Sequence, residues 1–390
     1  MIPPACMYGT CKERVFASRR ALYFSDKKPP NTHMKKLLLL AAPLLLVPLV
    51  PALRPTVVKI RFAPAEGTTL TRTMNNTSEF TLQDYSMTIN GNDSPMKPEM
   101  EMTMNQDQTV VVSDTYAKMA DGKPAKLSRK FDDISGTIAM SMKVDMMGNV
   151  QENENSRDLE SKLTGKKIVY TWNGEIGEYE LAFDPKEDND DLLKELHEDM
   201  DMRVLLPKGE VKEGESWKVD VKQLGHVISP GGDLKIKPKE DSSAESPMGM
   251  GDMGGAGSPT DWFNSDMEGE ATATFDGMRE VSGKSYAVIK LEVKAKGKKD
   301  LTEQAKENAA NAEAEGMKME MEKVEVSFEY EGTGELLWDL AGNHAHSFEF
   351  SGPAKAIMDI EMALEMQGQN MTIGQGMELA GTTKLKITLE

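Results

Sequence analysis

The stretch YAVIKLEVKAKG, residues 286–297, alternates apolar and charged side chains over most of its length. Its apolar set is Ala287, Ile289, Leu291, Val293 and Ala295, and its charged set is Lys290, Glu292, Lys294 and Lys296. Successive side chains of a β-strand point to opposite faces of a sheet. The period of two therefore predicts a strand with one face on a core and the other in water.

The same alternation recurs in IMDIEMALEMQ, residues 357–367, where methionine, isoleucine and leucine face one way and acids the other. Gly/Asn segments near residues 148–149 and 341–343 have the composition of hairpin turns. These patterns predict a mainly β fold of antiparallel, curved sheets, half-barrel or sandwich-like, with one or two short covering helices.

Two segments have helical rather than strand character. Residues 189–200, NDDLLKELHEDM, place their leucines and Met200 on one stripe, with Asn189 as the expected N-cap. Residues 301–316, LTEQAKENAANAEAEG, contain strong helix formers with almost no apolar stripe. We expect a solvated helical insertion there that ends at Gly316.

Methionine is abundant at 29 residues, which raises the question of metal binding. In GMKMEMEKVEVSFEYEG, residues 316–332, Met317, Met319 and Met321 recur at every second position, and thioethers are ligands that select Cu(I). A strand gives the same pattern whenever methionine fills a core face in place of leucine or isoleucine. The apolar parity changes after Met321, and a β-bulge there would return all of the apolar residues to one face. We favour core packing for this row, with a copper site as the alternative.

A leader-like segment precedes the strands. MKKLLLLAAPLLLVPLVPA, residues 34–52, has a pair of lysines, an apolar run and small residues suited to cleavage after Ala52. Its short length and its prolines favour a cleaved secretory signal peptide over an uncleaved spanning anchor, so we expect no membrane span after its removal. Residues 1–33 have no periodicity. We interpret them as a disordered upstream extension from a wrongly assigned start codon; an unusually long n-region is the alternative.

Removal of residues 1–52 would change the chemistry of the chain. This segment holds both cysteines, so the mature protein would contain no disulfide and no thiol nucleophile. It also holds eight Lys or Arg and two Asp or Glu, so the net charge moves from −18 to −24. A protein this acidic should repel nucleic acid and anionic membrane surfaces.

Past the leader we expect two β-rich units. The first, 53–206, would end in the short helix. The second, 207–390, would contain the helical insertion and a flexible loop at 237–262, which is rich in Gly, Ser, Pro and Asp.

The remaining candidate metal and cofactor sites are better explained by structural roles. His344 and His346 stand two residues apart and would share a strand face with Phe348 and Phe350, where neighbouring imidazoles suit Zn or Cu. No third ligand of suitable spacing accompanies them, so we expect histidines near a hairpin turn and no metal site. GMGDMG at 249–254 fits the glycine spacing of a dinucleotide fingerprint but lacks the flanking strand and helix. No pattern singles out a catalytic group, and we expect neither an enzyme nor a cofactor.

VLLPKGEVKEGESWKVDV, residues 204–221, contains the pattern L-P-x-x-x-V-x-x-G-x-x-W, formed by Pro207, Val211, Gly214 and Trp217. This stretch resembles a group of secreted bacterial β-rich proteins of unknown function. The resemblance implies a β-rich fold and export for most of residues 60–390, and it supplies no catalytic residues. Physically, Gly214 suits a turn, and Trp217 suits an anchor at a sheet edge or core.

These observations together predict an exported, non-catalytic β-rich protein, secreted or periplasmic in a bacterial cell envelope. Its apolar, methionine-containing sheet face is expected to bind an apolar small molecule or lipid. A structural or interaction protein of the envelope, with an envelope protein as its partner, is the first alternative. A Met-rich periplasmic copper-binding protein is the second.

Overall fold

The computed structural model describes residues 57–94, 98–146, 148–239, 267–309, 318–366 and 369–390. The expected extension 1–33, the signal peptide 34–52 with its cleavage site at Ala52, and most of the loop expected at 237–262 lie outside these residues. All described residues belong to one unit, Arg54–Glu390.

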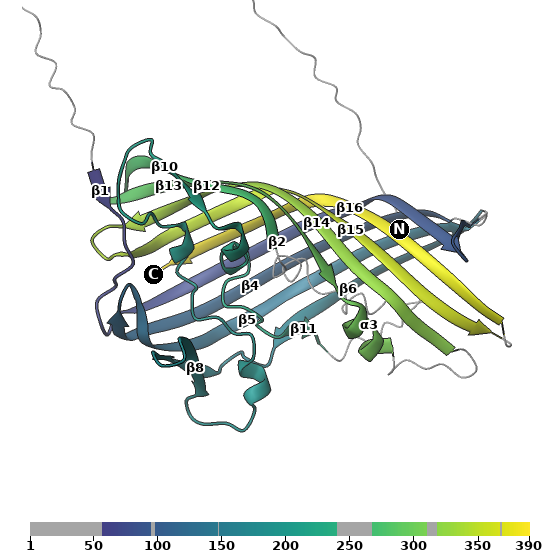
Figure 1. The fold of residues 1–390 in the computed structure, drawn as a ribbon, viewed down its shortest axis with the longest axis horizontal. Coiled ribbons are helices and arrows are strands. Elements are labelled where there is room, and N and C mark those ends of the chain that lie inside the picture. Colours follow the sequence, from purple (N-terminus) through teal and green to yellow (C-terminus); the bar gives the residue numbers. More distant parts are fainter. Residues whose placement is uncertain (1–56, 95–97, 147, 240–266, 310–317, 367–368) are drawn as a thin grey trace, which may run out of the picture. The chain divides into compact units, whose positions relative to one another are not determined.

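A 14-stranded sheet dominates the described part of the chain (Figure 1). Its main path runs through β10 (Ser216–Val219), β12 (Met267–Val281), β13 (Lys284–Asp300), β14 (Lys318–Asp339), β15 (His344–Met366), β16 (Gln369–Leu389), β2 (Thr69–Ile89), β4 (Glu99–Ala120), β5 (Lys123–Met146), β6 (Asn149–Ser161) and β11 (Ile236–Pro238). Off this path, β3 (Asn92–Asp93) pairs with β2, β7 (Lys167–Asn173) with β5, and β8 (Glu178–Phe183) with β7.

Every pairing in this sheet is antiparallel, so the predicted mainly β, antiparallel fold class is confirmed. β10 and β11 stand at the two ends of the path, and each has a single partner strand among the described residues. The sheet is therefore open, because these two end strands do not pair with each other.

The last strand of the chain lies in the middle of the sheet. β16 pairs with β2 from Ile373 opposite Ile89 to Leu389 opposite Arg72. Figure 1 shows the yellow β16 in the same sheet as the blue strands of the N-terminal half. Strands from the expected units 53–206 and 207–390 thus share this one sheet.

Side chains sort by parity onto two faces of the sheet. We call the face with the buried side chains the inner face. On β13 it presents Ile289, Leu291 and Val293, each at most 3% exposed, while Lys290 and Glu292 point outward and are exposed. The alternating stretch that predicts this strand therefore forms it with the expected orientation.

A register shift interrupts β14 directly after Met321, where the apolar parity of the sequence changes. Before the shift Met321 pairs with Met362, and after it Val324 pairs with Ile360. Met321 and Ile360 pack against the core that contains Val324. The predicted β-bulge is present, and it keeps the apolar residues of β14 on the inner face.

The helix predicted over residues 189–200 is wrong. The segment holds one turn of 3-10 helix, η1 (Asp190–Leu193), the expected N-cap makes no side-chain hydrogen bond, and Glu195 has a positive φ of 62°. The next backbone groups bond elsewhere: the His197 N–H donates to the Gly231 carbonyl at 2.9 Å. These tertiary partners override a helical pattern that local sequence alone supports.

Short elements join the core around this turn. They are η2 (Arg203–Leu205), β9 (Glu210–Lys212), which pairs with β1 (Val57–Lys59), η3 (Val221–Gln223) and α1 (Gly225–Ile228). Their neighbourhood buries Met200, Met202, Leu205, Leu224 and Val227 in the same core as the inner face. We call residues 190–206 the covering segment.

A helix, α3 (Thr302–Ala309), forms in the described part of the insertion expected at 301–316; residues 310–316 lie outside the description. Its first residue anchors it to β14, because the Val324 N–H donates to Thr302 Oγ1 at 3.0 Å. Within the described ranges, no helix combines the length and the apolar character needed to cross a membrane.

We predict that Gly381→Ala destabilises the sheet. A Cβ atom at Gly381 would lie 1.8 Å from the carbonyl oxygen of Glu79 on β2, so the strands must move apart. Forced overpacking of this kind lowers the free energy of unfolding by about 1–3 kcal/mol, measured here by urea denaturation. Gly209→Ala is the control, because its Cβ would meet nothing within 4 Å. Equal losses in the two variants would contradict the close approach.

Candidate functional site

Four charged side chains are fully buried between the inner face and the covering segment. They are Arg72 on β2, Asp114 on β4, Arg129 on β5 and Asp201 in the covering segment, each 0% exposed. Burial of a charge costs several kcal/mol per ion unless an opposite charge and hydrogen bonds compensate it. Here two cations and two anions are in contact, and we call the four residues the ion cluster.

Arg72 joins the two aspartates. Its Nη1 donates to Asp114 Oδ2 at 2.6 Å, and its Nη2 donates to Asp201 Oδ1 at 2.5 Å and to the Tyr116 hydroxyl at 3.1 Å. The Tyr116 hydroxyl in turn donates to Asp201 Oδ1 at 2.6 Å. One carboxylate therefore holds the covering segment to both β2 and β4.

Arg129 makes a second connection to the covering segment. Its Nε and Nη2 donate to the two oxygens of Asp114, each at 2.8 Å, in a bidentate pair. Its Nη1 and Nη2 also donate to the carbonyls of His197 and Glu198, at 3.0 and 2.9 Å. The last four carbonyls of a helix have no intrahelical partner, and Arg129 supplies donors to two carbonyls at the end of the segment predicted to be helical.

Alternation alone does not reveal this cluster, but the sequence contains a second signal for it. In LTRTM (70–74), VSDTY (112–116) and LSRKF (127–131), a charge occupies the inward position between two apolar or aromatic residues. Asp114 lies directly opposite Arg129 in the register of β4 and β5. Opposite charges at inward positions of neighbouring strands are the pattern by which the cluster could have been found.

Burial dominates the electrostatics of these groups. It would raise the pKa of Asp114, but Arg129 and Arg72 hold that pKa below its ordinary value. It raises the pKa of Asp201 against the opposing charge of Arg72. Burial and the neighbouring charge of Asp201 together raise the pKa of Tyr116 well above its usual range. Because neither solvent nor substrate reaches side chains with 0% exposure, the cluster acts by holding the covering segment on the sheet.

Glu198 lies in the covering segment beside the cluster and is 6% exposed. It accepts a hydrogen bond from Arg203, whose Nε also lies 3.1 Å from Asp199 and whose guanidinium carbon lies 5.3 Å from the centre of the Phe62 ring. Burial raises the pKa of Glu198 to about 7, although Arg203 opposes this shift. Glu198 is therefore a carboxyl group that titrates near neutral pH.

The inner face becomes less buried at the end of β14, β15 and β16 that is remote from the ion cluster. Its half-buried apolar side chains there are Ile89, Met362, Leu364, Met371 and Ile373. The register places Met362 between Met321 and Ile373, and Leu364 opposite Met371, so these side chains form adjacent rows. We call the five residues the open apolar face.

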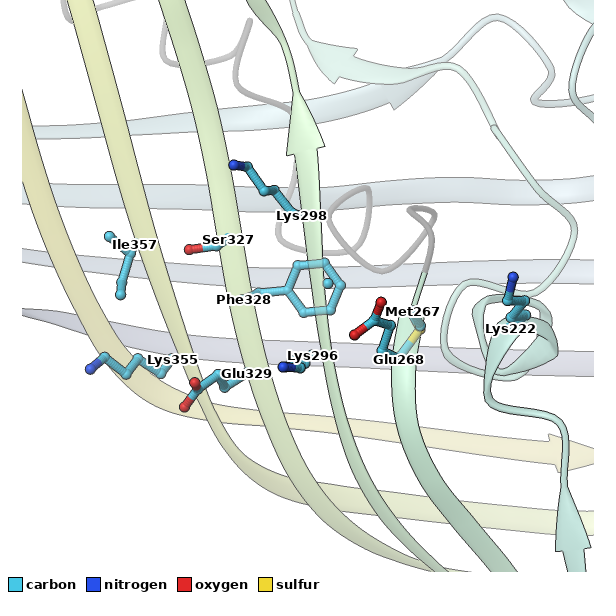
Figure 2. A pocket seen from close by; sticks show the side chains of 11 residues that line it. Lys222, Met267, Glu268, Lys296, Lys298, Ser327, Phe328, Glu329, Lys355 and Ile357 are labelled. Carbon is cyan, nitrogen blue, oxygen red and sulfur yellow. The ribbon is translucent and has the colours of Figure 1, made fainter.

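A cavity of about 580 Å³ lies on the same group of strands, where β12 begins (Figure 2). Phe328, Met267 and Ile357 supply its apolar part. Six of its eleven lining residues are charged, Lys296 and Glu329 among them. This lining is more polar than that of a usual small-molecule site, which is predominantly apolar.

Of the methionine row of the sequence, Met321 lies on the inner face of β14, opposite Met362. Met319 is opposite Leu364 in the backbone register, and Met317 falls outside the described residues. Met321 packs against the core that contains Val324.

His344 and His346 share the outer face of β15. A register shift between β14 and β15 adds one residue after Ala345, which is buried, so Phe348 and Phe350 lie on the inner face. The predicted single row of histidines and phenylalanines is wrong, because this bulge reverses the parity between them. Over the residues that the structure describes, no group of three His, Cys, Asp or Glu side chains is placed to hold a metal ion.

The segment that contains Pro207, Val211, Gly214 and Trp217 forms a corner of the sheet. Gly214 has a φ of +81°, and its N–H donates to the Phe275 carbonyl at 2.7 Å, so the expected turn is present. Trp217 lies on the end strand β10, and its indole N–H donates to the Leu205 carbonyl at 3.1 Å. Val211 is buried on β9. The motif thus fastens β10 to the end of the covering segment.

No family model and no curated protein matches the chain. Among solved structures, the chain is similar to the outer membrane protein OprG from Pseudomonas aeruginosa, with 10% identity, coverage of 84% of this chain and 99% of that chain, and a TM-score of 0.17. It is also similar to Pseudomonas putida OprB in its low-pH structure, with 7% identity, coverage of 82% and 91%, and a TM-score of 0.15. At these TM-scores neither likeness carries an argument about this chain.

We predict that Asp114→Asn strongly destabilises the protein. The change removes the anion that both buried arginines share, and loss of one partner from a buried ion pair costs about 3–5 kcal/mol. Urea denaturation measures the loss. Glu331→Gln is the control, because the Glu331–Lys294 pair is exposed and such pairs contribute about 0–1 kcal/mol. If Asp114→Asn lowers the free energy of unfolding by less than Glu331→Gln does, the buried charges do not depend on Asp114 for their compensation.

We also predict a pH-dependent effect of Glu198→Gln. The folded-state pKa of Glu198, about 7, lies above its ordinary value of 4.5, so the folded chain holds this proton more tightly than the unfolded chain. The stability from the protonated group is complete below about pH 4.5 and is lost as pH rises through about 7. The variant should therefore gain stability relative to the native chain between these values. Urea midpoints across the range measure this, and a constant difference would refute the assignment.

Proposed function

We propose that this protein is an exported, non-catalytic binder of an apolar, lipid-like ligand, secreted or periplasmic in the cell envelope. The observation that carries the proposal is the open apolar face. It presents half-buried methionine, leucine and isoleucine on one side of an ordered sheet. The cavity beside Phe328 and Met267 is a separate feature, because its charged lining residues Lys296, Glu329 and Lys355 stand in an outward row of β13, β14 and β15.

The inner face of β15 offers a continuous track for such a ligand. Its inward residues in this part are Ala356, Met358, Ile360, Met362 and Leu364. Its half-buried part, from Ile360 to Leu364, rises roughly 13 Å, which suits a segment of an extended hydrocarbon chain. Ala356 and Met358 are each 2% exposed, whereas Met362 and Leu364 are half-buried, so contact with a ligand is available at the far end of the track.

The chemistry of the track favours an apolar ligand of adaptable shape. Methionine is unbranched and flexible, so a face built from it adapts to tails of differing shape. The cavity lies apart from this track, because Glu268, Lys296 and Glu329 point to the outer face of the sheet (Figure 2).

Two further features support a carrier without catalysis. The leader at residues 34–52 favours export to an aqueous compartment, where apolar surface is costly unless it is covered. The four fully buried charges of the ion cluster are sealed from solvent and hold the covering segment.

We predict that the double variant Met362→Gln, Leu364→Gln loses bound ligand. Two apolar contacts become polar, and a loss of about 1.4 kcal/mol in binding free energy would weaken the Kd roughly tenfold. Lipid extraction and native mass spectrometry of protein purified from its own envelope fraction measure occupancy, and titration with a fluorescent fatty acid measures the Kd.

Ala363→Gln is the matched control, since this residue lies between the two changed positions but on the outer face of β15. It should retain the ligand. A native protein that carries no lipid and binds no fatty acid would overturn the proposal and favour an envelope interaction protein.

A further inference from the structure

Four methionines meet on the inner face of β4 and β5. Met102 lies directly opposite Met142, and Met104 directly opposite Met140, in consecutive inward positions of the two strands. Side chains directly opposite in an antiparallel pair have Cβ atoms roughly 4.5–5.5 Å apart, and inward neighbours along a strand are roughly 7 Å apart. The register thus brings four thioethers into one compact group, which we call the methionine square.

The square is reachable from one side. Met102 and Met104 are 2% and 6% exposed and form its floor, whereas Met140 and Met142 are half-buried. On the next strand, β6, Asn155 lies opposite Met140 and Asn153 lies opposite Met142. Two half-buried amides therefore border the half-buried thioethers.

Phe80 borders the square on the other side. It lies opposite Met104 in the register of β2 and β4 and is 2% exposed. The cross-strand neighbours that the register gives are thus one aromatic ring and two amides, and none of these three is a carboxylate or an imidazole. The two amide oxygens are ligands for hard cations, but the four thioethers outnumber them, and soft thioethers select Cu(I).

Packing alone does not require this composition. Where β14, β15 and β16 run together, inward rows mix methionine with valine, isoleucine, leucine and phenylalanine. In β4 and β5 two consecutive rows contain thioethers alone. The rows on either side pair Met100 with Val144 and Gln106 with Ile138, so only the two rows of the square pair one thioether with another, and Met100 adds a fifth thioether beside them.

We infer that the methionine square binds one Cu(I) ion through its thioethers. Methionine has three rotatable side-chain bonds, so four such residues anchored on a rigid pair of strands can turn their sulfur atoms toward a common centre. The site is separate from the open apolar face, which lies on β2, β15 and β16, and it does not depend on the proposed lipid-like ligand.

The test is an anaerobic titration of the full mature chain with Cu(I) against a chromogenic Cu(I) chelator. Native protein should hold one Cu(I) per chain, with sulfur in the first coordination sphere by X-ray absorption. Met102→Leu with Met142→Leu removes one opposed pair at nearly constant volume and should weaken the Kd at least tenfold. If this variant fails to fold, Met142→Leu alone, at a half-buried position, serves in its place.

The control is Met358→Leu with Met377→Leu. These methionines are also directly opposite in the register, but they are 2% and 1% exposed and have no second thioether pair beside them. The control should leave the Kd within about twofold of native. Absence of competition by the native chain, coordination by nitrogen or oxygen alone, or equal weakening in both double variants would overturn the inference. A negative Cu(I) titration leaves the lipid measurements unaffected. A negative lipid measurement likewise leaves the Cu(I) titration unaffected.

Discussion

Side-chain parity is the constraint on which the rest of this structure depends. Strands β2, β4, β5, β14, β15 and β16 each contain 21 to 24 residues. Over that length, one uncorrected extra residue would turn a whole apolar set toward solvent. The shifts after Met321 and between Leu82 and Asp84 correct the register where it would otherwise fail. Most inward positions of these strands therefore stay apolar across the shifts, although amides such as Gln106, and Asn153 on the neighbouring β6, also face inward.

The ion cluster is the exception that this apolar face tolerates. Arg72 and Arg129 stand at inward positions, and they are compensated by Asp114 from the sheet and by Asp201 from the covering segment. Because the compensation needs a group from outside the sheet, it also specifies where the covering segment docks. Hydrophobic contacts are not directional, whereas a set of charge-assisted hydrogen bonds is, so the cluster selects one position of this segment over its neighbours.

Local pattern was sufficient for much of the fold and little of the site. Alternation predicts β13, the inward methionines of β15 and even the bulge after Met321, because strand parity is a local property. The helix over residues 189–200 fails, since Glu195 has a positive φ and the His197 N–H donates to the distant Gly231 carbonyl instead of to a carbonyl four residues earlier. The ion cluster was missed because a charge within an alternating strand is read as outward-facing unless the register with the next strand is known. The open apolar face depends on what covers each row, which no single segment encodes.

The central place of β16 has a consequence for how the chain folds. β2, the first long strand, gains one of its two long neighbours only from the last strand of the chain. Pairing between such distant segments raises the contact order, and folding slows as contact order rises. A chain delivered across a membrane from its N-terminus would thus wait, with the apolar side of β2 uncovered, until its final residues arrive. During that interval wrong pairings compete, so folding in the cell would depend on a chaperone that occupies the unfinished edge.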